Sequence, residues 1–405
     1  MTNKMLKVAV SAAFFASASA AFAQGIRPAY NFPSTPSGSG PASVQMGGSP
    51  LYFTPYLGLA VGHDDNLFLS NTNKRSSTVY IVSPGFKVDA RNANTIFQLS
   101  YQGQIGRYTQ SDDDDYLDHT FRAQVDTAFD RRNFLKVGHD FLRSHDPRGS
   151  TDRAVSGRPD RYTLSSPYMT YAFGAPGSQG RAELYYSEGR KRYLNNRDTT
   201  IGSDRITREA GGALYFRVMP KTYLMGEVRR TDFSYRLASS PFNSREDRYY
   251  GGVSWEATAA TTGTVKVGRL EKRFDSGAPT FKGTSWEAIV TWAPRTYSKF
   301  DFYATRTTNE SSGLGDFILS DIAGVTWTHA WSSVMNTGVD ARFQRDKYKG
   351  FDRSDDIKSL GFKVGYKFRR WLTIGGEYTY TQRDSNQGAF EYDKNLYLLT
   401  ATASM

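Results

Sequence analysis

The sequence contains no cysteine, so disulfide bonds and thiolate metal sites cannot form within this chain. Beyond its N-terminal segment there is no apolar run approaching about 18 residues, which excludes an ordinary transmembrane helix. The 5 histidines lack the H-x-x-x-H and H-E-x-x-H spacings of metal sites. The phosphate-binding G-x-x-x-x-G-K and the catalytic G-x-S-x-G patterns are missing too. We therefore expect no metal, no cofactor and no enzymatic activity.

A concentrated basic block is also missing. Lysine and arginine number 51 against 40 aspartates and glutamates, a formal charge of +11, but the two signs are interleaved along the chain. A nucleic-acid-binding protein usually gathers its cations into a patch or stripe, so no nucleic-acid partner is predicted. Aromatic residues, by contrast, are plentiful and make up 14% of the sequence.

The first 23 residues carry the three parts of a secretory signal peptide in order. MTNKMLK is a basic start, VAVSAAFFASASA is an apolar centre, and Ala21–Ala23 has the small-residue pattern that precedes a cleavage site. Cleavage between Ala23 and Gln24 would leave Gln24–Pro50, which is rich in Gly, Pro and Ser. That composition buries too little apolar surface to order itself. Residues 24–50 are thus predicted to be a flexible periplasmic tail.

From Leu51 onward, apolar and polar side chains alternate. In Thr95–Tyr108 the apolar set is Phe97, Leu99, Tyr101 and Ile105, and the polar set is Gln98, Ser100, Gln102 and Gln104. Successive side chains of a strand point to opposite faces, so this segment predicts a strand with one apolar and one polar face.

The alternation recurs in about eighteen segments up to the end of the chain. They start near Leu51, Thr78, Thr95, His119, Phe134, Tyr162, Arg181, Ile206, Thr222, Arg248, Gly263, Thr284, Tyr297, Asp321, Val334, Ser359, Leu372 and Lys394. Short connections such as 91–94 and 130–133 alternate with long ones such as 144–161. This rhythm predicts that residues 51–405 form an all-β transmembrane antiparallel barrel, with short periplasmic turns, long extracellular loops and both termini in the periplasm.

In such a barrel the apolar face contacts outer-membrane lipid and the polar face lines the interior. The tryptophans fit this topology, since Trp255, Trp292, Trp327, Trp331 and Trp371 all fall near periplasmic strand ends, where an indole ring is stable at the membrane interface.

The polar phase of the strands predicts which residues line the lumen. The candidates are Gln98, Gln102, Gln104, Arg122, Asp126, Glu227, Arg229, Lys266, Glu287, Asp301, Asp340, Arg342, Lys363, Lys367 and Glu377. Their charges roughly cancel. Two interpretations stay open, namely cross-strand charge pairs that stiffen a wide barrel and charged rings along a path for sugars or ions.

Three loop motifs could carry chemistry. His63–Asp65 and Ser144–Asp146 each place an imidazole beside a carboxylate at an extracellular strand end, where His63 or His145 could act as the general base of a hydrolase. Neighbours in sequence do not by themselves form a catalytic geometry, so we interpret both as ordinary polar loop residues. The run Asp112–Asp115 lacks the spacing of a calcium loop and is interpreted as a loop tip.

Several stretches together resemble the outer-membrane β-barrel proteins encoded in exopolysaccharide biosynthesis operons, a branch of the putative β-barrel porin superfamily. They are HDDNLF (63–68), SPGF (83–86), PKTYLMGEVR (220–229), TWAPRTYSKFDFYATR (291–306), NESSGLGDF (309–317), WTHAWS (327–332) and EYTYTQRDSN (377–386). The resemblance implies that the barrel passes or guides a secreted polysaccharide across the outer membrane, with an export lipoprotein as partner. A general diffusion porin or nutrient channel is the alternative, and an outer-membrane hydrolase is a third hypothesis.

Overall fold

The computed structural model describes residues 43–153, 156–256 and 260–404. The predicted signal peptide with its Ala23–Gln24 cleavage site, and the predicted tail as far as residue 42, lie outside the described residues. At the end of that tail, Val44–Gln45 forms the short strand β1, which pairs with Tyr52 and Phe53. The structure therefore differs from the expected flexible tail at this point.

The fold is a closed antiparallel sheet of 19 strands, of which all but β1 form the barrel wall. The wall strands are β2 (Leu51–Asp64), β3 (Ser77–Arg91), β4 (Thr95–Tyr108), β5 (Tyr116–Ala128), β6 (Asn133–Asp146), β7 (Asp160–Phe173), β8 (Gly180–Tyr193), β9 (Arg205–Met219), β10 (Thr222–Tyr235), β11 (Ser244–Trp255), β12 (Thr261–Phe274), β13 (Phe281–Arg295), β14 (Ser298–Asn309), β15 (Phe317–Ala330), β16 (Met335–Lys349), β17 (Ser354–Arg369), β18 (Leu372–Ser385) and β19 (Tyr392–Ser404). The predicted barrel of about eighteen strands is confirmed.

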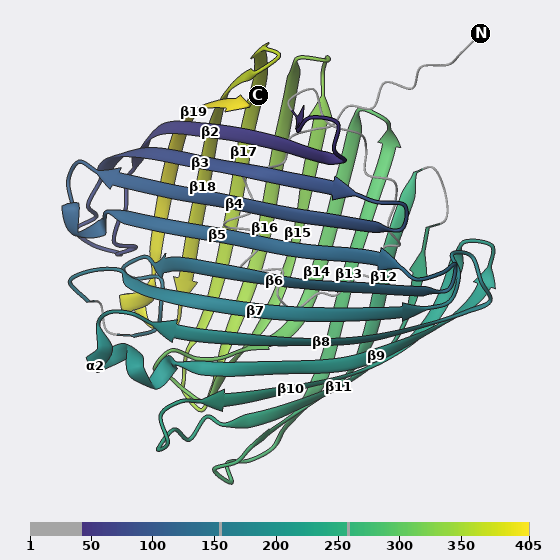
Figure 1. Cartoon of the computed structure of the whole chain (residues 1–405). Coiled ribbons are helices and arrows are strands. Elements are labelled where there is room, and N and C mark those ends of the chain that lie inside the picture. The colour runs from purple at the N-terminus through teal and green to yellow at the C-terminus, as the bar shows by residue number, and fades with distance from the viewer. Residues whose placement is uncertain (1–42, 154–155, 257–259, 405) are drawn as a thin grey trace.

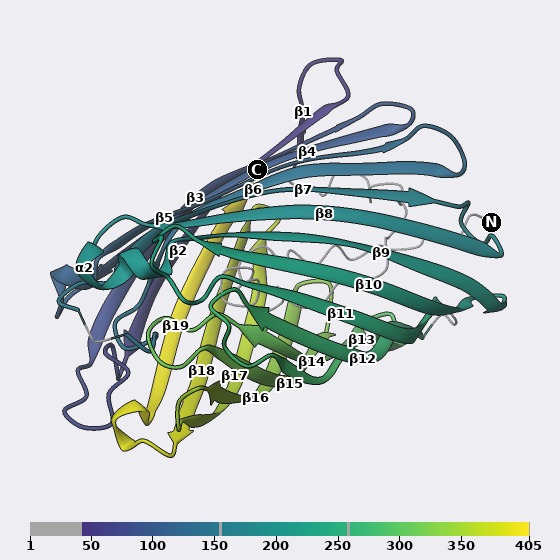
Figure 2. The same cartoon turned by 90° about the horizontal axis from the view of Figure 1, so that it is seen from below.

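Each wall strand pairs with the next, and β19 closes the sheet against β2, with Leu396 opposite Asp64 and Ser404 opposite Tyr56. Closure gives every described wall strand a partner on both sides, so the wall presents no open edge that lipid could not hydrogen-bond. In Figure 1 the front strands β2–β9 cross the rear strands β12–β18 steeply, as strands tilted to a barrel axis must. Figure 2 shows the two walls joined through β10 and β11.

Short turns and long loops occupy opposite ends of the barrel. β2 starts, and β19 ends, at the end that carries the two-residue turns 220–221, 296–297 and 370–371. The other end carries the long connections and their short helices, which are η1 (Asp112–Asp114), α2 (Arg197–Thr200), η2 (Ile201–Ser203) and η3 (Gly388–Phe390). None of the helices in the described part of the chain is long and apolar enough to span a membrane.

Some strands extend further into the loops than the apolar pattern predicts. β17 begins at Ser354 rather than near Ser359, and β11 begins at Ser244 rather than near Arg248. At these ends the outward positions are charged, and cross-strand ion pairs such as Arg345–Asp356 continue the pairing. The apolar alternation therefore stops before the hydrogen-bonded ladder does.

Burial in this barrel is the reverse of that in a soluble protein. Leu184 and Leu214 are 62% and 68% exposed on the outer face. Arg229, Lys266 and Glu287 are each only 1% exposed. An apolar outside and a polar inside are what a wall between hydrocarbon and water requires.

Candidate channel lumen

Four charged residues meet at mid-height on the inner face where β10–β13 curve. Arg229 of β10 bridges two carboxylates, with Nη1 2.7 Å from Glu287 Oε1 and Nη2 2.6 Å from Glu227 Oε1. Lys266 of β12 contacts the same two glutamates, at 2.6 Å and 2.8 Å. We call these four residues the central ion network. The charges of its two cations and two anions cancel. The alternation of apolar and polar residues along the strands predicts that all four side chains face the lumen.

Tyrosines complete the hydrogen bonding of the central ion network. The Tyr185 hydroxyl donates to Glu227 Oε1 at 2.6 Å, and the Tyr250 hydroxyl donates to Glu287 Oε1 at 3.1 Å. A buried charge is tolerated only when such partners replace its lost water. The network therefore acts as a single structural unit that links β10, β12 and β13 on the inner face.

Further polar clusters lie between the central ion network and the extracellular loops. Arg248 of β11 pairs with Glu246, and its Nη2 donates to the Thr307 hydroxyl at 2.9 Å. Higher still, Lys272 lies 2.7 Å from Glu310, in the β14–β15 loop. Both basic side chains are almost fully buried. Polar groups thus fill this side of the interior from its centre to the extracellular end.

The opposite wall carries a row of amides and carboxylates. Gln98 donates to Asp89 at 3.0 Å, Gln124 donates to Gln98 at 3.4 Å and to Asp126 at 2.5 Å, and the Tyr168 hydroxyl donates to Gln124 at 2.8 Å. We call these five residues the amide–carboxylate row. Its members are less buried than the central ion network.

The other predicted lining residues are distributed around the wall rather than joined. Arg122 holds Asp140 in a two-pronged ion pair at 2.7 Å and 2.9 Å. Asp301 and Asp340 accept from Thr291 and Thr326, Arg342 donates to Gln344, and Lys363 lies opposite Glu377 in the strand register. Gln102 and Gln104 are half-buried on β4, and Lys367 is exposed at the periplasmic end of β17.

A loop segment crosses the extracellular mouth. Asp152, between β6 and β7, accepts hydrogen bonds from the backbone amides of Ser312 at 2.9 Å and Leu314 at 3.2 Å, which belong to the β14–β15 loop. The next residue, Arg153, lies 2.6 Å from Asp160. Burial alone would lower the pKa of Arg153, but Tyr193 and Asp160 raise it above its usual value. Two loops from distant parts of the barrel are therefore tied together over its interior.

The sites considered for hydrolysis lack a nucleophile bonded to the imidazole. His145 Nδ1 lies 3.1 Å from Asp118, and the Ser144 hydroxyl donates to that same carboxylate at 3.0 Å rather than to the ring. His63 is exposed on β2 at the outer face. Neither arrangement is that of a serine–histidine pair poised for acyl transfer.

Three of the aspartates of Asp112–Asp115 pair with different arginines. Asp113 pairs with Arg158 at 3.0 Å, Asp115 pairs with Arg107 at 2.7 Å, and Asp114 is buried against Arg148. Diverging carboxylates with cationic partners do not form a divalent-cation site. Within the described residues, no group of three or more metal-ligating side chains comes together.

Several interior residues were not predicted from the sequence. Extending the alternation of β11 and β12 would have found Glu246, Tyr250 and Lys272. Glu310 and Asp152 lie in loops, where the sequence has no periodic signal that relates a side chain to the interior.

Together, the closed wall, the apolar exterior and the polar interior define an outer-membrane β-barrel of the porin type. The chain belongs to the family described as Putative beta-barrel porin 2, whose model matches residues 46–405. No match was found among curated proteins.

Several solved outer-membrane proteins are similar to this chain at low sequence identity. OccK2 (OpdF) of Pseudomonas aeruginosa, solved in complex with glucuronate, is 12% identical over 87% of this chain and 98% of that chain, with a TM-score of 0.48. OccAB3 of Acinetobacter baumannii is 10% identical over 88% and 99%, with a TM-score of 0.46. The FrpB iron transporter of Neisseria meningitidis is 12% identical over 82% and 62%, with a TM-score of 0.43.

Proposed function

We propose that this protein is an outer-membrane channel for small polar solutes. The observation that carries the proposal is the contrast between an apolar outer face and an inner face of balanced charge. The buried central ion network is neutral, and among the accessible inner side chains Arg122 is paired with Asp140 and Lys299 is paired with Asp301. A lining of this kind stabilises a polar solute without strongly selecting ions of one sign.

The channel proposal is tested by reconstituting the purified, folded protein in planar bilayers and in liposomes. We expect discrete conductance steps, weak ion selectivity, and entry of sugars that falls with their size. A folded barrel that gives no conductance above the detergent control would overturn the proposal.

A second candidate function is the passage of a secreted exopolysaccharide, with an export lipoprotein as partner. The amide–carboxylate row supports it, because amides, carboxylates and tyrosines are the groups that bind sugar hydroxyls along a wall. In this case the chain would guide a glycan rather than let small solutes diffuse.

Gene deletion distinguishes the two functions. Export predicts a loss of surface polysaccharide with unchanged uptake of small solutes, whereas a channel predicts the reverse. Complementation with Gln124→Ala tests the amide–carboxylate row, and Gln382→Ala is the matched control because Gln382 bonds Asp384 on the outer face. If both variants restore the polysaccharide equally, the row has no part in export.

A further inference from the structure

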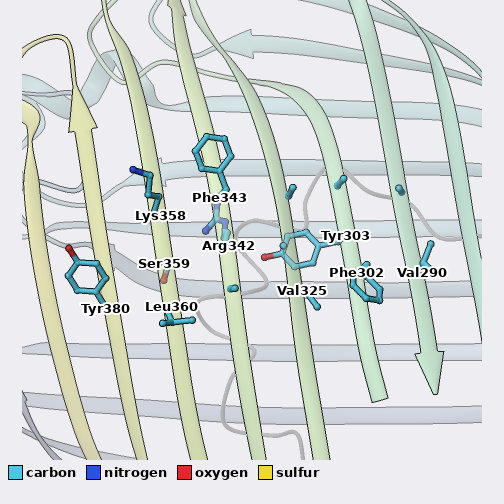
Figure 3. Close-up of a pocket in the computed structure, with 15 residues that line it drawn as sticks. Val290, Phe302, Tyr303, Val325, Arg342, Phe343, Lys358, Ser359, Leu360 and Tyr380 are labelled. Carbon is cyan, nitrogen blue, oxygen red and sulfur yellow. The ribbon is translucent and has the colours of Figure 1, made fainter. Parts of the chain in front are cut away.

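A shallow apolar groove of about 600 Å³ lies on the outer face of β13–β18. Figure 3 shows its rim, which includes Phe302, Phe343 and Leu360. The floor of the groove is formed by small side chains. Ala288 lies opposite Ala304, and Ala304 lies opposite Ala323, in the strand register. Three adjacent alanines on neighbouring strands leave a depression between larger apolar neighbours.

A continuous charged row borders the groove on its extracellular side. In register across five strands it runs Arg306, Asp321, Arg345, Asp356 and Asp384, and Trp286 of β13 lies beside Arg306. Arg306 Nη2 lies 2.7 Å from Asp321, and Arg345 Nε lies 2.7 Å from Asp356. Lys358, which lines the groove itself, lies 3.1 Å from Asp384.

Cations outnumber carboxylates in this strip. Arg306, Arg345 and Lys358 face three aspartates, and Lys347 adds a fourth cation at an exposed position of β16. The side chains of Arg345 and Lys358 are 45% and 55% exposed, so their charges remain available to a further anion. A phosphate group is a natural partner for such cations.

Aromatic rings border the groove on its periplasmic side. Trp292 and Trp327 stack on Phe300, with ring centroids 5.1 Å and 6.1 Å apart. From Arg306 to Phe300 the strand covers about 20 Å, at about 3.3 Å per residue. With a tilt of about 40°, this corresponds to about 15 Å of depth, which is one leaflet of the hydrocarbon core.

We propose that the groove binds one acyl chain of a phosphorylated glycolipid of the outer leaflet, of the lipid A class, with a phosphate held by Arg345 and Lys358. The charged row fixes the direction of the lipid, since the phosphate must lie at the extracellular edge. A lipid of the inner leaflet would carry its head group to the aromatic end, where the exposed cations Arg295, Arg369 and Arg370 lie at strand ends and turns and, unlike Lys358, do not line the groove. This proposal is independent of what passes through the lumen.

Native mass spectrometry of the purified full-length protein with added lipid A tests the proposal. We expect the folded wild type to retain one lipid A, and Ala304→Trp to lose it by at least about tenfold because the indole fills the groove. Ala210→Trp on the outer face of β9 is the matched control and should bind as wild type. If Ala304→Trp does not fold, as judged by its heat-dependent mobility on gels, Ala323→Leu replaces it.

The head-group contact has its own pair of variants. Arg345→Glu should lower lipid A binding by at least about tenfold. Arg245→Glu is the control, because Arg245 is also an outward arginine, 52% exposed and 2.8 Å from Asp232, but on β11. Lipid A without its phosphates, and phosphatidylglycerol, should both bind weakly.

Three results would overturn the proposal. These are equal lipid loss in the test and control variants, equal binding of phosphatidylglycerol and lipid A, and an Ala304→Trp protein that keeps its lipid but loses an oligomeric state. The last result would mean that a second copy of the chain covers the groove.

Discussion

The carboxylate of Asp152 accepts a hydrogen bond from the amide of Ser312 at 2.9 Å, although the two residues are 160 positions apart. A second amide, that of Leu314, donates to the same carboxylate at 3.2 Å. Each hydrogen bond to a charged group stabilises the folded conformation by about 1.5–3 kcal/mol. This contact is therefore one of those that hold the loop at 147–153 across the mouth of the barrel, beside the ion pairs Arg148–Asp114 and Arg153–Asp160.

Asp152→Ala should loosen that loop, because its tie to the β14–β15 loop is lost. We expect higher single-channel conductance and more frequent gating, because loss of the two hydrogen bonds favours the untied loop by about tenfold or more. Asp198→Ala is the control, since Asp198 is an exposed aspartate of α2 in another extracellular loop. Identical conductance traces for Asp152→Ala and the wild type would show that the loop does not limit the pore.

The central ion network should be much more sensitive to losing one member than to losing a matched pair. Arg229→Met leaves Glu287 buried with one cation fewer, and we expect a loss of about 3–5 kcal/mol of stability. The double variant Arg229→Met with Glu287→Met keeps the remaining Lys266–Glu227 pair neutral and should recover part of that loss. Urea unfolding in lipid vesicles measures both, and a double variant as unstable as the sum of the single ones would contradict the prediction.

The two faces of β4 offer a test of the membrane-facing assignment. Leu99→Arg places a charge in hydrocarbon and should cost about 2–4 kcal/mol. Gln102→Arg, on the opposite face of the same strand, should cost far less because its side chain meets water. Folding yield into vesicles and urea midpoints compare the two variants, and equal costs would mean that the faces are wrongly assigned.

Much of this architecture could be predicted from the sequence because the direction of a strand side chain is a local property. The alternation in Thr95–Tyr108 alone separates its lipid-facing and lumen-facing residues. Which inner residues meet is not local. Glu227 and Glu287 share Arg229 only because strand pairing sets the register and the wall curves between β10 and β13.

The same limit applies to the outer groove and to the loops. Ala288, Ala304 and Ala323 are unremarkable in sequence, and they form one depression only because three strands align them. The Asp152 contact depends on two loops that carry no periodic pattern. Loop conformation follows from tertiary contacts between distant segments, and single-sequence patterns do not encode these.

Lys363 and Glu377 provide the most direct test of the lumen, since they lie opposite each other on β17 and β18 and are only half-buried. Lys363→Gln removes a cation from the inner face, so the channel should shift toward cation selectivity, and Glu377→Gln should shift it toward anions. Reversal potentials under a salt gradient measure both. Lys358→Gln is the control, because Lys358 is on the same strand but lines the outer groove. If Lys363→Gln and Lys358→Gln give the same reversal potential, the inner face of β17 does not line the path of the ions.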